Sequence, residues 1–157
     1  MKKIKIKWTE LLIFIVSAEL VGALSALLAG DFGSFYSQLI QPHLSPPGWV
    51  FPVVWAILYG LMGISAYIVS ESESPVRSAA LGAYVIQLAV NFSWSIIFFR
   101  FKFLNTAAVA AVVLAVLVAF MICLFRKISK KAAYINVPYM VWSLFAAYLA
   151  IGTAFLN

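Results

Sequence analysis

The sequence predicts an all-α integral membrane protein, a single-domain bundle of five transmembrane helices. Of the 157 residues, 65% are hydrophobic and 10% are charged, whereas a soluble domain carries about 25% charged residues. Five apolar runs are each long enough to cross a hydrocarbon core of about 30 Å. None alternates like a membrane strand, and within lipid only helices and closed barrels satisfy their backbone. The predicted spans of this single domain, residues 1–157, are 8–28, 49–69, 79–99, 104–125 and 136–156.

The first span, residues 8–28, follows the basic segment MKKIKIK and has two interpretations. A cleavable signal peptide begins in the same way, and the small residues ALSA (23–26) would offer a cleavage site. The apolar stretch is too long for a usual signal core, however, and Glu19 interrupts it. We therefore expect a retained first helix. Glu19 is a functional candidate because of its depth, although a protonated, hydrogen-bonded glutamate with a structural role is the favoured interpretation.

Residues 29–48 form the one long connection, and we predict that they act as a lid. Ser45 can cap the second helix, and Pro46 and Pro47 suit its first turn, where a proline removes no backbone hydrogen bond. Trp49 would then lie at the membrane–water boundary, where its amphipathic ring is favoured. These residues would fix how the chain enters the second span.

Three predicted helices each carry an aromatic or amide stripe, because residues three or four positions apart share a helix face. Amides inside a span either lock a bundle through interhelical hydrogen bonds or line an apolar ligand cavity. Spacing alone does not decide between these roles. The stripes are Phe51, Trp55 and Tyr59 in the second span, Gln87, Asn91, Trp94 and Phe98 in the third, and Pro138, Trp142, Phe145 or Ala146, and Leu149 in the fifth.

The net charge of +6 indicates membrane topology rather than a nucleic-acid surface. With five spans, the N-terminal lysines, Arg77 and the basic residues of segment 126–131 fall on one side of the bilayer. Only Arg100 and Lys102 fall on the other. The positive-inside rule therefore places the N-terminus in the cytoplasm and the C-terminus outside. We expect the lipid bilayer, and no nucleic acid, as a partner.

No catalytic or metal-binding constellation is recognisable. His43 is the only histidine, and no second His, Cys or carboxylate stands at metal-ligand spacing. The chain has neither a haem-attachment motif nor a glycine-rich phosphate loop, and Cys123 alone forms no intramolecular disulfide. We therefore expect no metal and no required cofactor. A bound tetrapyrrole would be metal-free, or held through its faces and carboxylates.

Four segments closely resemble the tryptophan-rich sensory protein family, also called the translocator protein or peripheral-type benzodiazepine receptor family. They are PHLSPPGWVFPVVWAILYGLMGISAY, QLAVNFSWSIIFF, PYMVWSLFAAYL and the loop segment FYSQLIQP. The resemblance implies a protein of the bacterial cell membrane, a five-helix bundle that is commonly dimeric. It also implies a cavity that binds porphyrins such as protoporphyrin IX and benzodiazepine-type ligands. Some bacterial members are linked to light-dependent breakdown of protoporphyrin.

The resemblance implies roles for single residues as well. Trp55 and Trp142 match the cavity tryptophans, and they would carry any photochemical role. Tyr36 would close the lid, and Ala146 would lie against the ligand. The predicted ligand-binding residues are Tyr36, Pro47, Trp49, Phe51, Trp55, Tyr59, Gln87, Asn91, Trp94, Phe98, Trp142, Phe145 and Ala146.

Three loop positions depart from the family pattern. Phe35 and Leu44 stand where relatives often have tryptophan, and Gln41 stands where they commonly have a basic residue. The change at Gln41 removes one cation that could meet a ligand carboxylate. No Lys or Arg follows Tyr148, so the weak sterol pattern is absent there and we expect no specific sterol site.

Four functions follow from these features. The leading one is a binding protein and sensor for tetrapyrroles, and the second is porphyrin breakdown in which the excited pigment supplies the chemistry. The third is a transporter, with Glu19 as its natural proton-coupling group. A purely structural scaffold is the least favoured, because it leaves the stripes unexplained.

A homodimer is also expected, because stripes of small residues permit close helix packing. Which stripe packs within the protomer is not decided by the sequence. The candidates are Ala18–Gly22–Ser25, Ala79–Gly82–Ala83, and the alanines at 107, 111, 115 and 119.

Overall fold

The computed structural model describes residues 5–157, so Lys2 and Lys3 of the topology prediction lie outside the described part. Five of its helices are long and apolar enough to cross a membrane, which confirms the predicted fold class. None of the described residues belongs to a strand. The elements are α1 (Trp8–Ala29), α2 (Phe32–Gln38), α3 (Val50–Ser70), α4 (Arg77–Ser95), the π-helix η1 (Ile96–Arg100), α5 (Leu104–Ile128), α6 (Lys130–Ile135) and α7 (Val137–Leu156).

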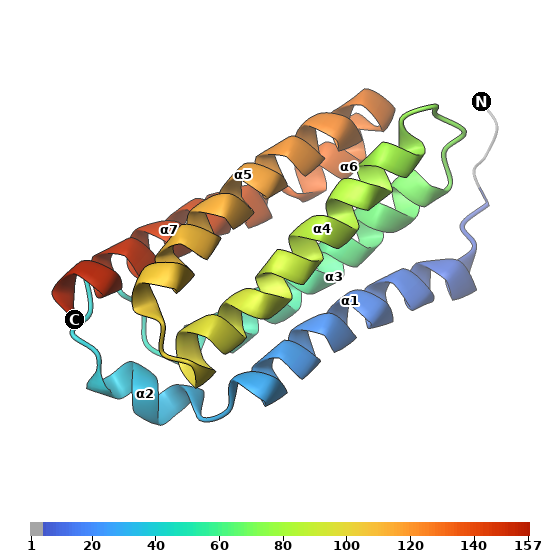
Figure 1. Cartoon of the computed structure of the whole chain (residues 1–157). Helices are drawn as coiled ribbons and strands as arrows, with labels where there is room; N and C mark the ends of the chain where they lie inside the picture. The colour runs from blue at the N-terminus through green and yellow to red at the C-terminus, as the bar shows by residue number, and fades with distance from the viewer. Residues whose placement is uncertain (1–4) are drawn as a thin grey trace.

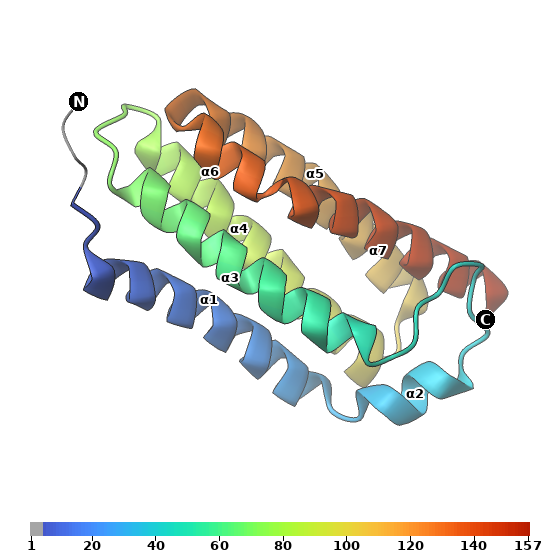
Figure 2. The same ribbon diagram turned by 180° about the vertical axis from the view of Figure 1, so that it is seen from behind.

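The long helices run side by side, and the short helix α2 lies at one end of the bundle (Figures 1 and 2). The C-terminus lies at this same end, which we call the α2 end. The start of α1, the α3–α4 turn and α6 lie at the opposite end, the α6 end. Helix α1 packs mainly on α3, whereas α5 packs between α4 and α7. The chain therefore crosses the bundle an odd number of times.

The start of α3 differs from the prediction. The helix begins at Val50 without a side-chain cap, because the Ser45 hydroxyl donates to the Pro42 carbonyl at 2.8 Å instead. Pro47 precedes the helix, and its carbonyl accepts the Val50 N–H at 3.0 Å. The prolines thus shape the turn before α3 rather than its first turn. Trp49 is 69% exposed beside them.

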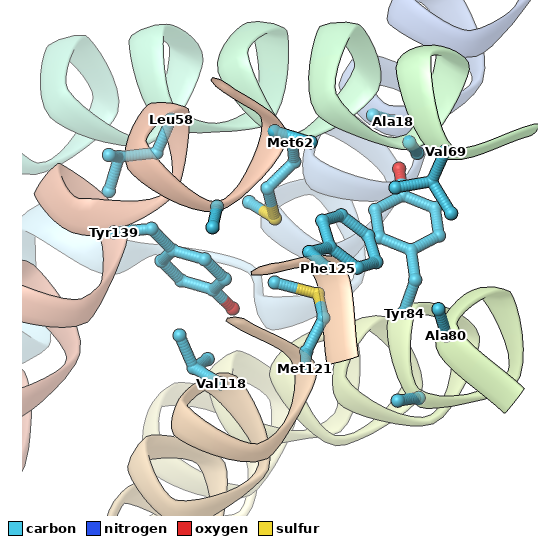
Figure 3. Packing of buried hydrophobic residues seen from close by; sticks show 14 of the residues in the cluster. Ala18, Leu58, Met62, Val69, Ala80, Tyr84, Val118, Met121, Phe125 and Tyr139 are labelled. Carbon is cyan, nitrogen blue, oxygen red and sulfur yellow. The ribbon is translucent and has the colours of Figure 1, made fainter. Parts of the chain in front are cut away.

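Large side chains fill the half of the bundle nearer the α6 end (Figure 3). Met62 and Val69 of α3 meet Met121 and Phe125 of α5, and all four are fully buried. Tyr139 of α7 closes this cluster on the side that faces the α2 end. This half is therefore close-packed by large side chains.

Glycine allows α1 and α3 to approach closely. A Cβ atom on Gly63 would lie 2.6 Å from Ile15 Cα and 2.7 Å from the Phe14 carbonyl oxygen, so a larger residue would force the helices apart. On α1, Gly22 lies against the Tyr59 ring. These contacts fix which face of α1 turns toward the bundle interior.

An ion pair ties the start of α1 to the end of α3. Lys7 Nζ lies 3.1 Å from Glu71 Oε2, and the Lys7 backbone N–H donates to the Tyr67 hydroxyl at 2.9 Å. The hydrogen bond from Lys7 lowers the pKa of Glu71, and the same bond raises the pKa of Lys7. The two helices are thus joined at the α6 end by an ion pair between residues that flank α1 and α3, and by a hydrogen bond to Tyr67 near the end of α3.

Candidate functional site

A cavity of about 400 Å³ occupies the half of the bundle nearer the α2 end. Its walls come from α1, α2, α3, α4, η1 and α7, and aromatic and small side chains dominate the lining. A largely apolar cavity of this size with a few placed polar groups is typical of small-molecule binding sites. The predicted ligand-binding residues that line it are Tyr36, Phe51, Trp55, Tyr59, Asn91, Trp94, Phe98, Trp142 and Ala146.

Aromatic rings from α2, α3 and α7 form a continuous chain of contacts along one wall. Tyr36 and Phe51 meet edge to face with centroids 5.3 Å apart, and Phe51 meets Trp142 in the same way at 5.8 Å. Trp142 then stands perpendicular to Trp55, at 89° and 6.5 Å. Each edge-to-face contact restrains the next ring. The wall thus presents fixed aromatic surfaces to the cavity.

A hydrogen-bonded polar group forms the floor of the cavity. The Tyr139 hydroxyl donates to Gln87 Oε1 at 2.6 Å and accepts from Asn91 Nδ2 at 3.1 Å. Gln87 is 0% exposed and Asn91 is 2% exposed, yet only Asn91 is part of the lining. Of the two roles left open for these amides, the structure thus gives Gln87 the interhelical one.

The remaining predicted ligand-binding residues also lie off the cavity. Pro47 and Trp49 are exposed in the turn before α3, because the helix begins later than expected. Phe145 lies behind Trp142, with centroids 5.5 Å apart, and its other face stacks on Tyr148 at 6.2 Å. Of the two alternatives on α7, Ala146 is the residue that reaches the lining.

Helix α2 covers the α2 end of the cavity. Asp31 begins this helix by accepting the Ser34 N–H at 3.2 Å, and hydrogen bonds from Ser34 lower the pKa of Asp31. Tyr36 lines the cavity from above, and its hydroxyl donates to the Pro46 carbonyl at 2.7 Å. Burial raises the pKa of Tyr36. Residues 29–48 therefore hold a structured cover over the cavity.

The C-terminal part of α7 holds this cover in place. The Asn157 side chain accepts the Ile40 N–H at 3.0 Å and donates to the Ile40 carbonyl at 2.8 Å. The Tyr148 hydroxyl donates to the His43 carbonyl at 2.8 Å. Pro42 packs on Gly152, where a Cβ atom would lie 2.7 Å from the proline ring. The segment after α2 is thus attached to α7 at three points.

Comparison with known proteins identifies the family. Residues 12–156 match the model of the TspO/MBR family. The chain belongs to the TspO/MBR family. It is 33% identical over 150 residues to a tryptophan-rich sensory protein of Cereibacter sphaeroides, covering 96% of this chain and 92% of the relative. It is 30% identical over 125 residues to a translocator protein of Ovis aries, covering 78% and 74%. The predicted resemblance is confirmed.

The unusual lid residues of this TspO/MBR member have local partners. The Lys102 ammonium lies 4.9 Å from the centre of the Phe35 ring, a cation–π contact. Gln41 Nε2 donates to the Tyr36 carbonyl at 2.9 Å, which closes the end of α2. Leu44 is 80% exposed and has a φ of +68°. Gln41 thus stabilises the cover instead of offering a charge to a ligand.

The sequence did not predict two aromatic residues of the TspO/MBR cavity, Phe99 and Phe32. Phe98 and Phe99 both line it, because η1 is a π-helix and its wider turn brings successive side chains toward one side. A strict helical period predicts only Phe98. Phe32 of α2 also lines the cavity and contacts Phe99, with centroids 4.7 Å apart. Phe32 lies in the segment 29–48, where no helical periodicity indicated that its side chain would reach the cavity.

Charged groups are rare in the cavity. Within the described part of the chain, Glu19 of α1 is the only charged residue of the lining. The same part contains no group of three His, Cys, Asp or Glu side chains placed to hold a metal ion. Trp142 Nε1 is buried without a hydrogen-bond acceptor. The site can therefore stack on a flat ligand and accept hydrogen bonds at one carboxylate.

Proposed function

We propose that this TspO/MBR member is a membrane sensor that binds tetrapyrroles, with protoporphyrin IX as the representative ligand, and similar planar hydrophobic molecules. The observation that carries the proposal is the chain of rings from Tyr36 to Trp55 along the cavity wall. Flat aromatic ligands gain most from such fixed aromatic surfaces. The names of the relatives, sensory protein and translocator protein, agree with ligand binding in a membrane.

The position of the basic residues supports an orientation for a porphyrin. Arg100 donates to the Leu28 carbonyl at 3.4 Å, and Lys102 lies over Phe35 of α2. Both cations therefore lie at the α2 end, near the cover. The apolar ring of a porphyrin would occupy the cavity, and its two carboxylates would point toward these cations.

A titration of protoporphyrin IX in the dark, followed by its main absorption band, tests the proposal. Ala146→Trp places an indole inside the cavity and should abolish saturable binding. Ala89→Trp is the matched control, because Ala89 is exposed on α4 and is not part of the lining. Saturable binding by the wild type and by Ala89→Trp alone supports the proposal. Equal binding by both variants would refute it.

Light-dependent porphyrin breakdown extends this proposed function. Trp55 and Trp142 both line the cavity, where they could quench or redirect the products of an excited pigment. Trp55→Phe and Trp142→Phe should then stop breakdown under illumination, even at porphyrin concentrations that saturate each variant in the dark. Bleaching at the same rate with and without the protein would remove this role.

Transport is the alternative function, and Glu19 on the cavity wall is the observation that favours it. The fully buried core of Met62, Met121 and Phe125 between the cavity and the α6 end favours binding instead. Glu19→Gln should abolish pH-dependent porphyrin uptake into vesicles if the protein is a proton-coupled transporter. No change in uptake would remove the coupling role.

The proposal includes residence in the cell membrane with the N-terminus in the cytoplasm. Arg126, Lys127, Lys130 and Lys131 lie near or in α6, at the same end as the start of α1 (Figure 1). This clustering fits the positive-inside rule. Alkaline phosphatase fused after Asn157 should be active, since it folds only outside the cytoplasm. An inactive phosphatase with a fluorescent green fluorescent protein fusion at the same site would contradict this orientation.

We also propose a homodimer. The structure places two of the three candidate stripes within the protomer, since Ala18 and Ser25 are 1% and 2% exposed and Ala111 is 3% exposed. On α4, by contrast, Ala79 and Gly82 are exposed, and a Cβ atom on Gly82 would meet nothing within 4 Å. This face of α4 remains available for a second copy.

A further inference from the structure

Glu19 occupies a defined place on the cavity wall. It lies in the second half of α1 and is partly buried. Its Oε1 atom lies 3.3 Å from the position that a Cβ atom would take on Gly60 of α3. Gly60 thus leaves room for the carboxylate beside α3, and one turn further along α3, Gly63 holds the two helices in contact.

The surroundings of Glu19 provide no balancing charge. Both ion pairs in the described part of the chain involve Lys7, near the α6 end. No Lys, Arg or His of the described residues lines the cavity. The hydroxyls of Ser25 and Ser45 donate to the Phe92 and Pro42 carbonyls, so they are already engaged. The Gly60 backbone of α3 gives this carboxylate a hydrogen-bond contact but no charge. A ligand is therefore the available source of a positive charge.

Electrostatics in an apolar cavity makes such a carboxylate selective. Charges interact far more strongly there than in water, and a carboxylate without a partner is costly to hold inside a membrane. A cation or an N–H donor placed beside Glu19 would lower this cost. A ligand carboxylate at the same position would add repulsion between like charges.

We infer that Glu19 makes the cavity selective for planar aromatic ligands that place a cationic or N–H-bearing nitrogen against its carboxylate. The inference rests on the proposed function, since it names the ligand chemistry of the same cavity. For a porphyrin it assigns the carboxylates to the end where Arg100 and Lys102 lie, away from Glu19. Glu19 is thus a specificity-determining residue.

Three acridines of equal ring size test the selectivity without a porphyrin. At mildly alkaline pH, aminoacridine is a cation, acridine is neutral and acridine carboxylate is an anion. Each is titrated into purified wild-type protein, and tryptophan fluorescence reports binding. The wild type should bind the cation at least about tenfold more tightly than the anion, which corresponds to about 1.4 kcal/mol. The neutral ring should fall between them.

Glu19→Gln removes the charge and keeps the shape, so the preference for the cation should fall below about threefold. Affinity for neutral acridine should stay within about twofold. Glu73→Gln is the matched control, because it makes the same change in net charge at an exposed residue between α3 and α4. It should keep the wild-type preference.

Carbodiimide labelling gives a second readout that needs no variant. Dicyclohexylcarbodiimide is apolar and reacts with carboxyl groups inside membranes, so mass spectrometry should detect one adduct on Glu19. Saturating aminoacridine should protect Glu19 in the wild type, and acridine carboxylate should not.

An unchanged preference in Glu19→Gln would overturn the inference, as would equal labelling with both acridines. A wild type that binds none of the three acridines would overturn it too, while porphyrin binding could still stand. Failure of protoporphyrin IX and every acridine to bind saturably would instead refute the proposed function itself.

Discussion

The Tyr139 hydroxyl donates a 2.6 Å hydrogen bond to Gln87 Oε1, and both side chains are fully buried between α7 and α4. On one side of this pair lies the close-packed core of Met62, Met121 and Phe125. On the other side lies the cavity, which Asn91 reaches. The polar contact therefore marks the boundary between the part of the bundle that provides stability and the part that can accept a ligand.

Tyr139→Phe should destabilise the protein. The change removes the partner of Gln87 Oε1 and of Asn91 Nδ2, and buried groups left unpaired cost about 1–3 kcal/mol. Thermal unfolding in detergent should show a Tm lowered by several degrees. Tyr134→Phe is the control, because Tyr134 is 65% exposed. Equal Tm values for the two variants would contradict the structural role of Tyr139.

Gly63→Ala should separate α1 from α3. Its new Cβ atom would lie 2.6 Å from Ile15 Cα, and overpacking of this kind costs about 1–3 kcal/mol. Denaturant unfolding of the purified protein measures this cost. Gly33→Ala serves as the control, since a Cβ atom there comes no nearer than 4.0 Å to Asp31 Oδ1. Unchanged stability in Gly63→Ala would mean that the two helices are not so close.

Asn157→Ala should loosen the cover of the cavity. It removes both side-chain hydrogen bonds to the Ile40 backbone, so amide hydrogens of residues 39–45 should exchange several-fold faster, while those of α5 should not change. Hydrogen exchange followed by mass spectrometry detects the difference. Ser78→Ala is the control, at an exposed residue near the start of α4, at the opposite end of the bundle from the cover. Identical exchange in the two variants would show that Asn157 does not hold the segment.

The Lys7–Glu71 pair should give a pH-dependent contribution to stability. The hydrogen bond from Lys7 lowers the pKa of Glu71 from its ordinary value of 4.5. The contribution is therefore present above pH 4.5, and it is lost as the pH falls through the lowered pKa. The Tm of the wild type should exceed that of Glu71→Gln near neutral pH, and the gap should close in acid.

Glu73→Gln is the control for this pair, because Glu73 is exposed and forms neither ion pair of the described residues. Its Tm should follow that of the wild type at every pH. A gap between the wild type and Glu71→Gln that is the same in acid and at neutral pH would exclude ionisation of Glu71 as its cause.

Gly82→Leu should convert the proposed homodimer into a monomer. The side chain would project from the exposed face of α4, where a Cβ atom meets nothing within the protomer, so the fold should persist. Light scattering of the detergent-solubilised protein should report half the protein mass. Val109→Ala on exposed α5 is a control that should stay dimeric. An unchanged particle mass for Gly82→Leu would show that Gly82 is not part of the dimer interface.

The sequence predicted the helical bundle well because each span shows its own signal in length and composition. The stripes on α3 and α7 also placed Trp55 and Trp142, since a regular helix keeps residues of one face together. Gln87 and Asn91 share a helix face as predicted, but they lie one turn apart along α4, and only Asn91 lines the cavity. A difference of one helical turn therefore decides whether an amide side chain is buried in the core or lines the cavity.

Other features depend on tertiary geometry that no single helix encodes. Phe99 reaches the cavity because of the π-turn of η1, and Phe32 reaches it because the loop folds into α2. The position of Glu19 beside Gly60 results from the contact of α1 with α3. Periodicity could not reveal these relationships, since each joins residues of different elements or departs from the regular helix.

Quenching of tryptophan fluorescence by protoporphyrin IX in the dark tests most directly whether the cavity binds porphyrin. Trp142 lines the cavity, whereas Trp8 is 66% exposed at the start of α1. The wild type and Trp8→Phe should show saturable quenching with the same affinity, and Trp142→Phe should bind several-fold more weakly. Linear, unsaturable quenching that is equal in all three proteins would show partition into detergent and contradict binding in the cavity.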